Sequence, residues 1–165
     1  MWHGSSIHTL PFKDKNVFRR TRRILENADM NLFVSDELFE TAKKITRNFK
    51  GEISYNGIDT NKFRHYNDAE RESFRKEKGI AQNEKCVAFV GNCIPVKNVQ
   101  YLPTLFNHIS RQVEKIKFFI LGNGNFTELF AESGLDITYA NNVNNVEMPK
   151  WYNCMDLIVM PSINE

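Results

Sequence analysis

Short apolar runs alternate with amphipathic stretches along most of this chain. Residues 16–27 carry apolar side chains at helical spacing among four arginines, which predicts a helix with one strongly basic face. Residues 30–34 form an apolar run that predicts a buried strand. Ser35 then stands as the predicted N-cap of a second helix, which reaches about Arg47. A strand followed by a helix is the order typical of α/β proteins.

A polar segment divides this first part of the chain from a longer second part. Asn56-Gly57 predicts a turn, and residues 60–68 are polar with scattered aromatic side chains. We therefore place residues 1–62 in one domain and residues 63–165 in another. The Gly-, Ser- and His-rich residues at the start of the chain predict a loop.

Strands and helices alternate through the second part. The predicted strands are residues 86–90, 116–121, 137–139 and 157–160. The predicted helices are residues 69–79, which end at Gly79, and residues 98–113, 126–133 and 148–154. Because helices of this length connect the strands, the strands must pair in parallel, in a doubly wound sheet. Ligands of such sheets bind at the carboxyl ends of the strands.

The loop at residues 91–98 follows the first of these strands and suits an anion. Gly91 lets the backbone approach a ligand closely, Lys97 adds a positive charge, and the predicted helix start at Asn98 presents backbone N–H groups. An ordinary turn with a solvated lysine fits the same residues. The second loop, residues 122–125, has Gly122 and Gly124 and indicates either close approach of a ligand or a tight connection.

Three further segments contain candidate binding residues. Residues 140–147 are rich in asparagine and could bind the polar edge of a base, although a simple surface loop has the same composition. Glu165 follows the last strand, where a carboxylate can accept hydrogen bonds from sugar hydroxyls. His3 and His8 flank a glycine and two serines, which indicates either a site or two surface histidines.

Composition and charge narrow the function classes. The chain has 165 residues, with 22 Lys and Arg against 20 Asp and Glu, and this net charge of +2 gives no support to a nucleic-acid partner. No apolar run approaches the roughly 20 residues of a membrane span, and the start lacks the pattern of a signal peptide, so we expect a cytoplasmic protein. Cys86, Cys93 and Cys154 lack the spacing of a zinc site or a disulfide framework, so we expect no metal and buried thiols.

Six segments, taken in order, resemble the family-four (group 1) retaining glycosyltransferases. The first three are residues 3–8, similar to the family's His-Gly-Ser-Asp-Ile-His loop, residues 28–35, similar to its stretch of alanine-aspartate, apolar strand and valine-serine, and residues 53–59, similar to its Asn-Gly-Ile-Asp segment. The others are residues 91–98, similar to Gly-Arg-Leu-x-Pro-x-Lys-Gly, residues 122–124, similar to Gly-x-Gly, and residues 149–165, similar to the run that ends at the first glutamate of the Glu-seven-residues-Glu motif.

The resemblance implies the GT-B architecture, in which two Rossmann-like domains with doubly wound parallel sheets face each other. Both sheets are expected to be incomplete in this chain, which we interpret as an internal piece of a longer protein. Residues 1–62 would then be the C-terminal part of the acceptor-side domain with the hinge. Residues 63–165 would be most of the donor domain, which binds the nucleotide sugar.

The implied reaction is transfer of a sugar, hexosyltransferase-like, from a nucleoside diphosphate sugar to a carbohydrate or lipid-linked acceptor, with retention. The resemblance also implies that the reaction needs no metal and no cofactor, with the nucleotide sugar as co-substrate. It further implies a place in polysaccharide or glycolipid biosynthesis. The implied catalytic residues are His3, near the reacting sugar, and Glu165, on its hydroxyls. The implied donor-binding residues are Gly91, Asn92, Lys97, Gly122, Gly124, Asn142 and Val143.

The sequence departs from the family pattern at three places. Asn92 stands where the family has its diphosphate-binding arginine, so neutralisation of the diphosphate would depend on Lys97. Ser6 stands where the family has an aspartate. The chain ends at Glu165, before the second glutamate of the family motif.

Three alternative readings remain open. The first is a truncated, catalytically inactive nucleotide-binding fragment, and the second is a sugar-nucleotide epimerase with similar donor loops. The third concerns the basic face of Arg19, Arg20, Arg22 and Arg23, which could hold the protein at the inner membrane surface by attracting anionic lipids. A solvated helix face has the same sequence.

Overall fold

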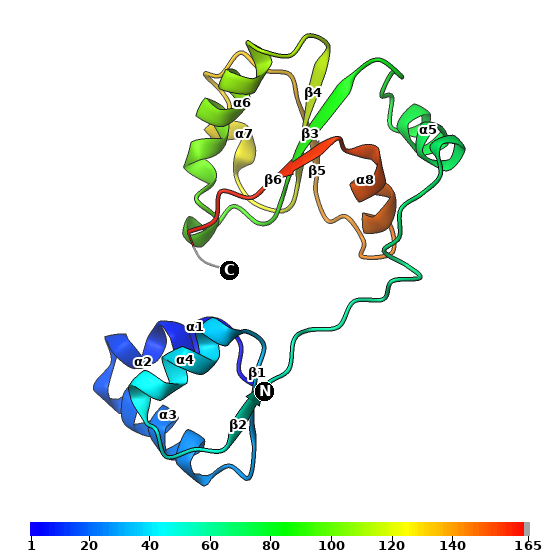
Figure 1. Ribbon diagram of the computed structural model, residues 1–165. Helices are drawn as coiled ribbons and strands as arrows, with labels where there is room; N and C mark the ends of the chain where they lie inside the picture. The colour runs from blue at the N-terminus through cyan, green and yellow to red at the C-terminus, as the bar shows by residue number, and fades with distance from the viewer. Residues whose placement is uncertain (164–165) are drawn as a thin grey trace. The chain divides into compact units, whose positions relative to one another are not determined.

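The computed structural model describes residues 1–163, with the side chain of Ser5 excepted (Figure 1). The chain forms two compact units, which divide between Ile58 and Asp59, inside the polar segment. No helix in the described part of the chain combines the length and apolarity needed to cross a membrane.

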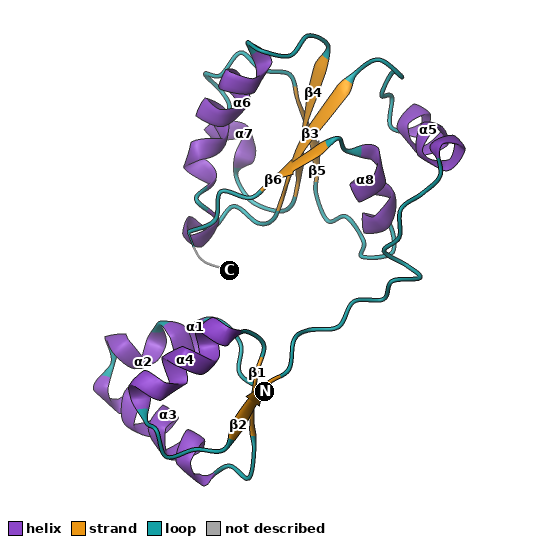
Figure 2. Ribbon diagram, in the orientation of Figure 1, coloured by secondary structure: helices purple, strands orange, loops and turns teal. Residues whose placement is uncertain are grey.

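The first unit is a small parallel sheet with helices around it (Figure 2). Strands β1 (Asn31–Phe33) and β2 (Gly51–Ile53) pair in parallel, and Trp2 forms an isolated parallel bridge with Phe33. The helices are α1 (Ser5–His8), α2 (Leu10–Lys13), α3 (Lys15–Asn27) and α4 (Asp36–Ile45). The prediction of a loop at the start of the chain is therefore wrong, because α1 and α2 occupy it. Strand β2 was not predicted.

Capping side chains set the starts of the two longer helices in this unit. Ser35 accepts a hydrogen bond from the Leu38 N–H at 3.3 Å, which confirms it as the N-cap of α4. Asp14 accepts from the N–H groups of Asn16 and Val17 at the start of α3. Each cap satisfies backbone donors that the first helical turn leaves without a partner.

A buried asparagine organises the centre of the first unit. Asn31 is 3% exposed, and its amide donates to the carbonyls of Leu25 and Lys50 while its oxygen accepts from the Trp2 indole. With these partners the buried amide costs little, because each polar atom is satisfied. Around it lies a core formed by Ile7, Leu25, Phe33, Leu38, Ala42 and Ile45.

The second unit contains a four-stranded sheet with the order β5-β4-β3-β6, in which every neighbouring pair is parallel. The strands are β3 (Lys85–Val90), β4 (Ile116–Leu121), β5 (Ile137–Ala140) and β6 (Leu157–Val159), and the helices are α5 (Asp68–Glu77), α6 (Leu102–Ser110), α7 (Phe126–Leu129) and α8 (Met148–Cys154). This confirms the predicted α/β fold with parallel strands.

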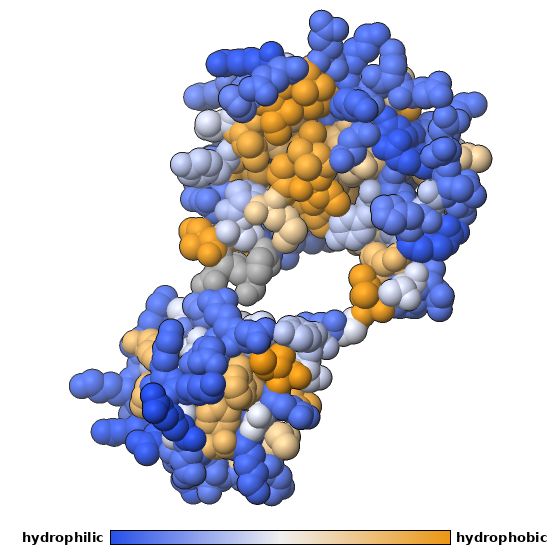
Figure 3. Space-filling model, viewed as in Figure 1, coloured by the Kyte–Doolittle hydropathy of each residue, from blue (hydrophilic) through white to orange (hydrophobic). Residues whose placement is uncertain are grey.

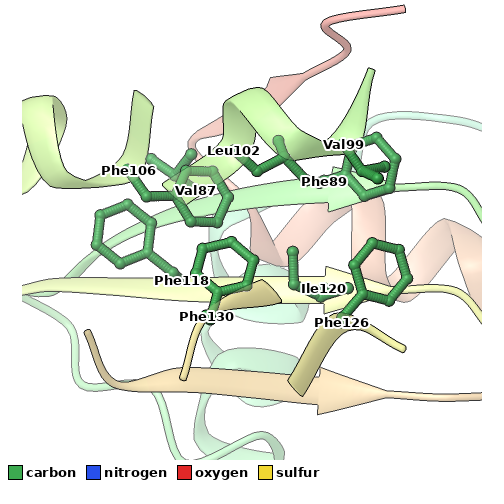
Figure 4. Close-up of a cluster of buried hydrophobic side chains, with 9 residues drawn as sticks. All are labelled: Val87, Phe89, Val99, Leu102, Phe106, Phe118, Ile120, Phe126 and Phe130. Carbon is green, nitrogen blue, oxygen red and sulfur yellow. The ribbon is translucent and has the colours of Figure 1, made fainter. Parts of the chain in front are cut away.

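Both faces of the second sheet are covered, α6 and α7 lying over one and α5 and α8 over the other (Figure 1). One core contains Val87, Phe89, Val99, Leu102, Phe106, Phe118, Ile120, Phe126 and Phe130 (Figure 4). The other contains Ile80, Cys86, Ala88, Phe119, Leu121, Cys154 and Met155. Alternate residues of β3 and β4 face opposite cores, which is why both strands are apolar almost throughout.

The bounds of two predicted helices are wrong. The α-helix expected from residue 98 begins at Leu102, because Asn98 has a left-handed backbone (φ 52°) between two 3-10 turns, Pro95–Lys97 and Val99–Tyr101. The helix expected over residues 126–133 ends at Leu129. Gly79 does follow the end of α5 with a positive φ of 69°, the conformation in which glycine is favoured after a helix.

Arg75 joins the helices of one face to the amino end of the sheet. Its guanidinium is almost fully buried, and it donates to the carbonyls of Cys154, at 2.7 Å, Glu84 and Ala81. It also lies 3.3 Å from a carboxylate oxygen of Asp156. Cys154 ends α8, Glu84 directly precedes β3 and Asp156 directly precedes β6, so one side chain fixes α5 against α8 and the start of the strands.

Asp156 completes this contact. The same carboxylate oxygen accepts the Cys86 N–H at 2.8 Å, and the other accepts from Arg71 at 3.0 Å. Burial alone would raise the pKa of Asp156, but the Cys86 N–H and the two arginines together outweigh it and hold the pKa below its usual value. The carboxylate is therefore charged at neutral pH and stabilises the unit in that form.

We predict that Arg75→Met lowers the free energy of unfolding of the second unit by about 3 kcal/mol, because it leaves the Asp156 carboxylate without its buried partner. Urea denaturation of both proteins measures the loss. The control is Arg64→Met, which removes an exposed pair with Glu70 and should cost about 0.5 kcal/mol. Equal losses for the two variants would contradict the role given to Arg75.

Candidate functional site

Three loops come together at the carboxyl end of the second sheet. They follow β3 (residues 91–98), β4 (residues 122–125) and β5 (residues 141–147). The ladder of parallel hydrogen bonds continues into them, with the Gly91 N–H donating to the Leu121 carbonyl at 2.9 Å and the Gly122 N–H to the Ala140 carbonyl at 3.2 Å. The adjacent β5-β4-β3 order is what places these loops beside one another.

The glycines of the first two loops allow backbone to lie against backbone. A Cβ on Gly122 would lie 1.8 Å from the carbonyl oxygen of Gly91, far inside contact distance. A Cβ on Gly124 would lie 2.3 Å from the Cβ of Cys93. Gly91 and Gly124 also have positive φ angles of 152° and 129°, which side chains disfavour. Packing between the loops therefore requires these glycines, whereas the sequence suggested only close approach of a ligand.

Hydrogen bonds join the same loops side by side. The Asn92 Oδ1 accepts the Asn123 N–H at 3.1 Å, and the Asn123 carbonyl accepts the Cys93 N–H at 2.8 Å. The Asn123 Oδ1 in turn accepts the Asn142 N–H at 3.1 Å. Asn123 was not singled out from the sequence, since its position between two neighbouring loops depends on the strand order.

Lys97 lies in the first 3-10 turn, half-buried, on the same loop as Gly91 and Asn92. The α-helix predicted to start at Asn98 begins at Leu102, so no helix N-terminus at Asn98 adds to the positive charge of Lys97. The N–H groups of Lys97, Asn98 and Tyr101 are bound to carbonyls within the turns, and Pro103 leaves one of the first residues of α6 without an N–H. Lys97 therefore carries the positive charge on this loop without a helix N-terminus behind Asn98.

The loop after β5 contains two of the predicted donor-binding residues, Asn142 and Val143. Asn142 is exposed and has a left-handed backbone (φ 53°), a conformation that asparagine tolerates. The Val143 side chain is half-buried and packs against the second core of the unit. Of the predicted donor-binding residues, the structure brings Gly91, Asn92, Gly122, Gly124 and Asn142 together by direct contacts.

Of the two predicted catalytic residues, the structure describes only His3. His3 is exposed and follows Trp2 in the first unit, where its carbonyl accepts a hydrogen bond from the Ser6 hydroxyl at 2.5 Å. The neighbouring His8 lies 2.8 Å from the Glu37 carboxylate. Glu165 lies outside the described residues.

Cysteines and metal ligands do not form a second site in residues 1–163. Cys86 and Cys154 are fully buried, as expected, and burial raises the pKa of the Cys86 thiol to about 11. Cys93 is half-buried against Gly124. No group of three or more His, Cys, Asp or Glu in these residues is arranged to hold a metal ion.

Known sequences match this chain along most of its length. Residues 70–165 match the family described as glycosyl transferases group 1. TuaC of Bacillus subtilis (strain 168), whose name places it as a glycosyltransferase in teichuronic acid biosynthesis, is 26% identical over 163 residues, which are 99% of this chain and 40% of that protein. An uncharacterized glycosyltransferase of Methanocaldococcus jannaschii, MJ1607, is 28% identical over 123 residues, which are 70% of this chain and 31% of that protein.

Solved structures share the fold. Sucrose-phosphate synthase from Thermosynechococcus elongatus superposes with a TM-score of 0.77 at 16% identity, over 96% of this chain and 41% of that one. Anabaena HepE in complex with UDP superposes with a TM-score of 0.78 at 15% identity, over 93% of this chain and 44% of that one. The fold is thus that of the GT-B glycosyltransferases, with small parallel sheets, and the chain spans about two fifths of the length of these relatives.

We predict that Gly122→Ala lowers the free energy of unfolding of the second unit by about 3 kcal/mol, because the new methyl group forces the loop away from Gly91. Gly134→Ala is the control: its φ of 68° is unfavourable for a side chain, but a Cβ there meets open space, so the change should cost only about 1 kcal/mol. Chemical denaturation measures both losses. A loss for Gly122→Ala no larger than that of the control would contradict the contact.

Proposed function

This chain belongs to the glycosyl transferases group 1 family, and we propose that it supplies the nucleotide-sugar site for transfer of a sugar to an acceptor with retention. The observation that carries the proposal is the convergence of three loops, one of them with Lys97, at the carboxyl end of the second sheet. This is the edge at which doubly wound sheets bind their ligands. The HepE structures of similar fold hold UDP and UDP-glucose, which supports a nucleoside diphosphate sugar here.

Lys97 is the residue proposed to stabilise the leaving group. As the bond between the sugar and the diphosphate breaks, negative charge grows on the diphosphate, and a fixed cation lowers the energy of that transition state. We propose that no metal ion is required, that His3 contacts the reacting sugar, and that Glu165 binds the sugar hydroxyls. These two residues rest on the family pattern.

The acceptor is proposed to be a carbohydrate or a lipid-linked sugar, and the donor a hexose carried by the nucleotide. The name of the TuaC relative supports a place in the synthesis of a polysaccharide. A second candidate function is nucleotide binding without turnover. Asn92 favours this alternative, since an amide cannot replace the charge of the family's arginine.

A basic surface on the first unit supports docking at the cytoplasmic face of a membrane. Arg19, Arg20, Arg22 and Arg23 are exposed on α3, and hydrophilic side chains project from this part of the molecule in Figure 3. Arg22 is partly neutralised by Glu26 at 2.8 Å. Beside them lies a hollow of about 420 Å³, lined by Pro11, Phe12, Lys13, Asp14, Lys15, Phe18 and Arg19.

Exposed apolar side chains accompany these charges. Phe12 is 50% exposed and Leu10 is 49% exposed, and the Phe12 ring meets that of Phe18 edge to face at 6.2 Å. Cations beside exposed aromatic rings suit the interface of an anionic bilayer, where the rings enter the headgroup layer and the cations stay at its surface. We therefore propose that α2 and α3 hold the protein beside a lipid-linked acceptor.

The donor site is tested by titrating the chain with UDP, GDP and ADP and following its melting temperature and binding heat. We predict that at least one of the three binds, and that Lys97→Ala weakens its binding by about 10- to 100-fold, because a charge-assisted contact is lost. Lys76→Ala, on the exposed face of α5, should leave the affinity unchanged. A cooperative melt that none of the nucleotides shifts would contradict the proposal.

Membrane docking is tested by flotation with vesicles of phosphatidylglycerol and phosphatidylcholine. We predict binding that grows with the anionic fraction and falls at least tenfold when Arg19, Arg20 and Arg23 are changed together to Glu, since each charge contributes about 1 kcal/mol. The matched control changes Lys43 and Lys44 on α4, and Arg47 shortly after its end, to Glu, for the same change in net charge. Equal binding by the two triple variants would mean that this surface does not dock.

A further inference from the structure

Asn92 has a role that the family's arginine cannot perform. Its Oδ1 accepts the Asn123 N–H at 3.1 Å and so ties the loop after β3 to the loop after β4. A guanidinium has five N–H donors and no acceptor, so an arginine at this position would leave the Asn123 N–H without this partner. The substitution therefore removes a charge and adds an acceptor.

The same arrangement repeats one strand further along the sheet. The Asn123 Oδ1 accepts the Asn142 N–H at 3.1 Å, and Asn142 follows β5. Two side-chain amides thus connect three loops in the order of their strands, and we name Asn92, Asn123 and Asn142 the amide chain. The Asn142 N–H meets Asn123 at the place where the ladder between β4 and β5 has ended.

Both linking asparagines keep their Nδ2–H donors available. Asn92 and Asn123 are exposed, and no acceptor within residues 1–163 takes a hydrogen bond from either Nδ2. A side-chain amide that accepts through its oxygen still has two such protons. Phosphate oxygens are acceptors for them, so the amide chain offers neutral donors on the loops that the proposed diphosphate would meet.

We propose that Asn92 is a positioning residue, whose amide holds the three loops, through Asn123 and Asn142, in the arrangement that receives the diphosphate. The proposal rests on the proposed function for the ligand, but not for the amide chain itself. The amide chain assists diphosphate binding by ordering the loops through hydrogen bonds, whereas a guanidinium would assist it by attracting the diphosphate through its charge. Binding should then depend on the order of these loops as well as on Lys97.

The amide chain is tested first without any ligand, by NMR hydrogen exchange on the ¹⁵N-labelled protein. Asn92→Ala and Asn92→Arg should both speed exchange of the Asn123 N–H about fivefold, whereas Asn92→Asp, which keeps the accepting oxygen, should leave it slow. Asn123→Ala should speed exchange of the Asn142 N–H alone. Unchanged exchange at Asn123 in Asn92→Ala would overturn the amide chain.

The positioning role is tested by the affinity of the same proteins for UDP, GDP and ADP. Asn92→Ala should weaken binding about five- to tenfold while the melting temperature of the free protein stays within about 4 °C of the wild type. Asn123→Ala should weaken nucleotide binding too, although this substitution lies on the neighbouring loop. Asn16→Ala, on the exposed surface of α3, is the control and should change neither quantity.

The two measurements separate the failures. Faster exchange with unchanged nucleotide affinity would show that the amides only stabilise the loops, which overturns the positioning role. If the wild-type protein binds none of the three nucleotides, the proposed function fails and the positioning role fails with it, while the exchange data still decide whether the amide chain exists.

Discussion

The contact between Gly122 and the carbonyl oxygen of Gly91 is the constraint on which the rest of the candidate site depends. Because glycine has no Cβ, the loops after β3 and β4 can lie with backbone against backbone at Gly122. That closeness places the Asn123 N–H within reach of Asn92 and the Cys93 N–H within reach of the Asn123 carbonyl. A side chain at Gly122 would separate the loops and break both bonds.

The buried contact of Arg75 with Asp156 and the candidate site lie at opposite ends of the second sheet. The buried Arg75, with Asp156 and Cys86, ties helices to strands at the amino end through hydrogen bonds. At the carboxyl end, the loops expose Asn92, Asn123 and Asn142 to solvent. The exposed loops are thus carried by a sheet whose other end is tied to its helices.

Two elements have the bounds that their apolar patterns predict, the strand Ile116–Leu121 and the helix Met148–Cys154. The strand lies inside a sheet that is covered on both faces, and the helix contributes to one of the two cores. The short helices α1 and α2 were missed since a segment rich in Gly, Ser and His, followed by a proline, has no helical period. The start of α6 was misplaced because the backbone of Asn98 depends on the fold of its loop.

The candidate site was partly predictable for a similar reason. The rule that ligands meet the carboxyl ends of strands singled out the loops with the glycines and Lys97. The assignment of Asn92 and Asn142 came from the resemblance to the family. The contribution of Asn123 and the accepting role of Asn92 depend on which strands are neighbours. That order becomes visible only in the folded sheet.

The measurement that tests the central claim most directly is a map of backbone amide shifts in the ¹⁵N-labelled chain on titration with UDP, GDP and ADP. The account predicts that the shifts concentrate in residues 91–98, 122–125 and 141–147, on all three loops together. Shifts confined to a single loop, or centred on the amino end of the sheet around Arg75, would contradict a nucleotide-sugar site built from the three loops.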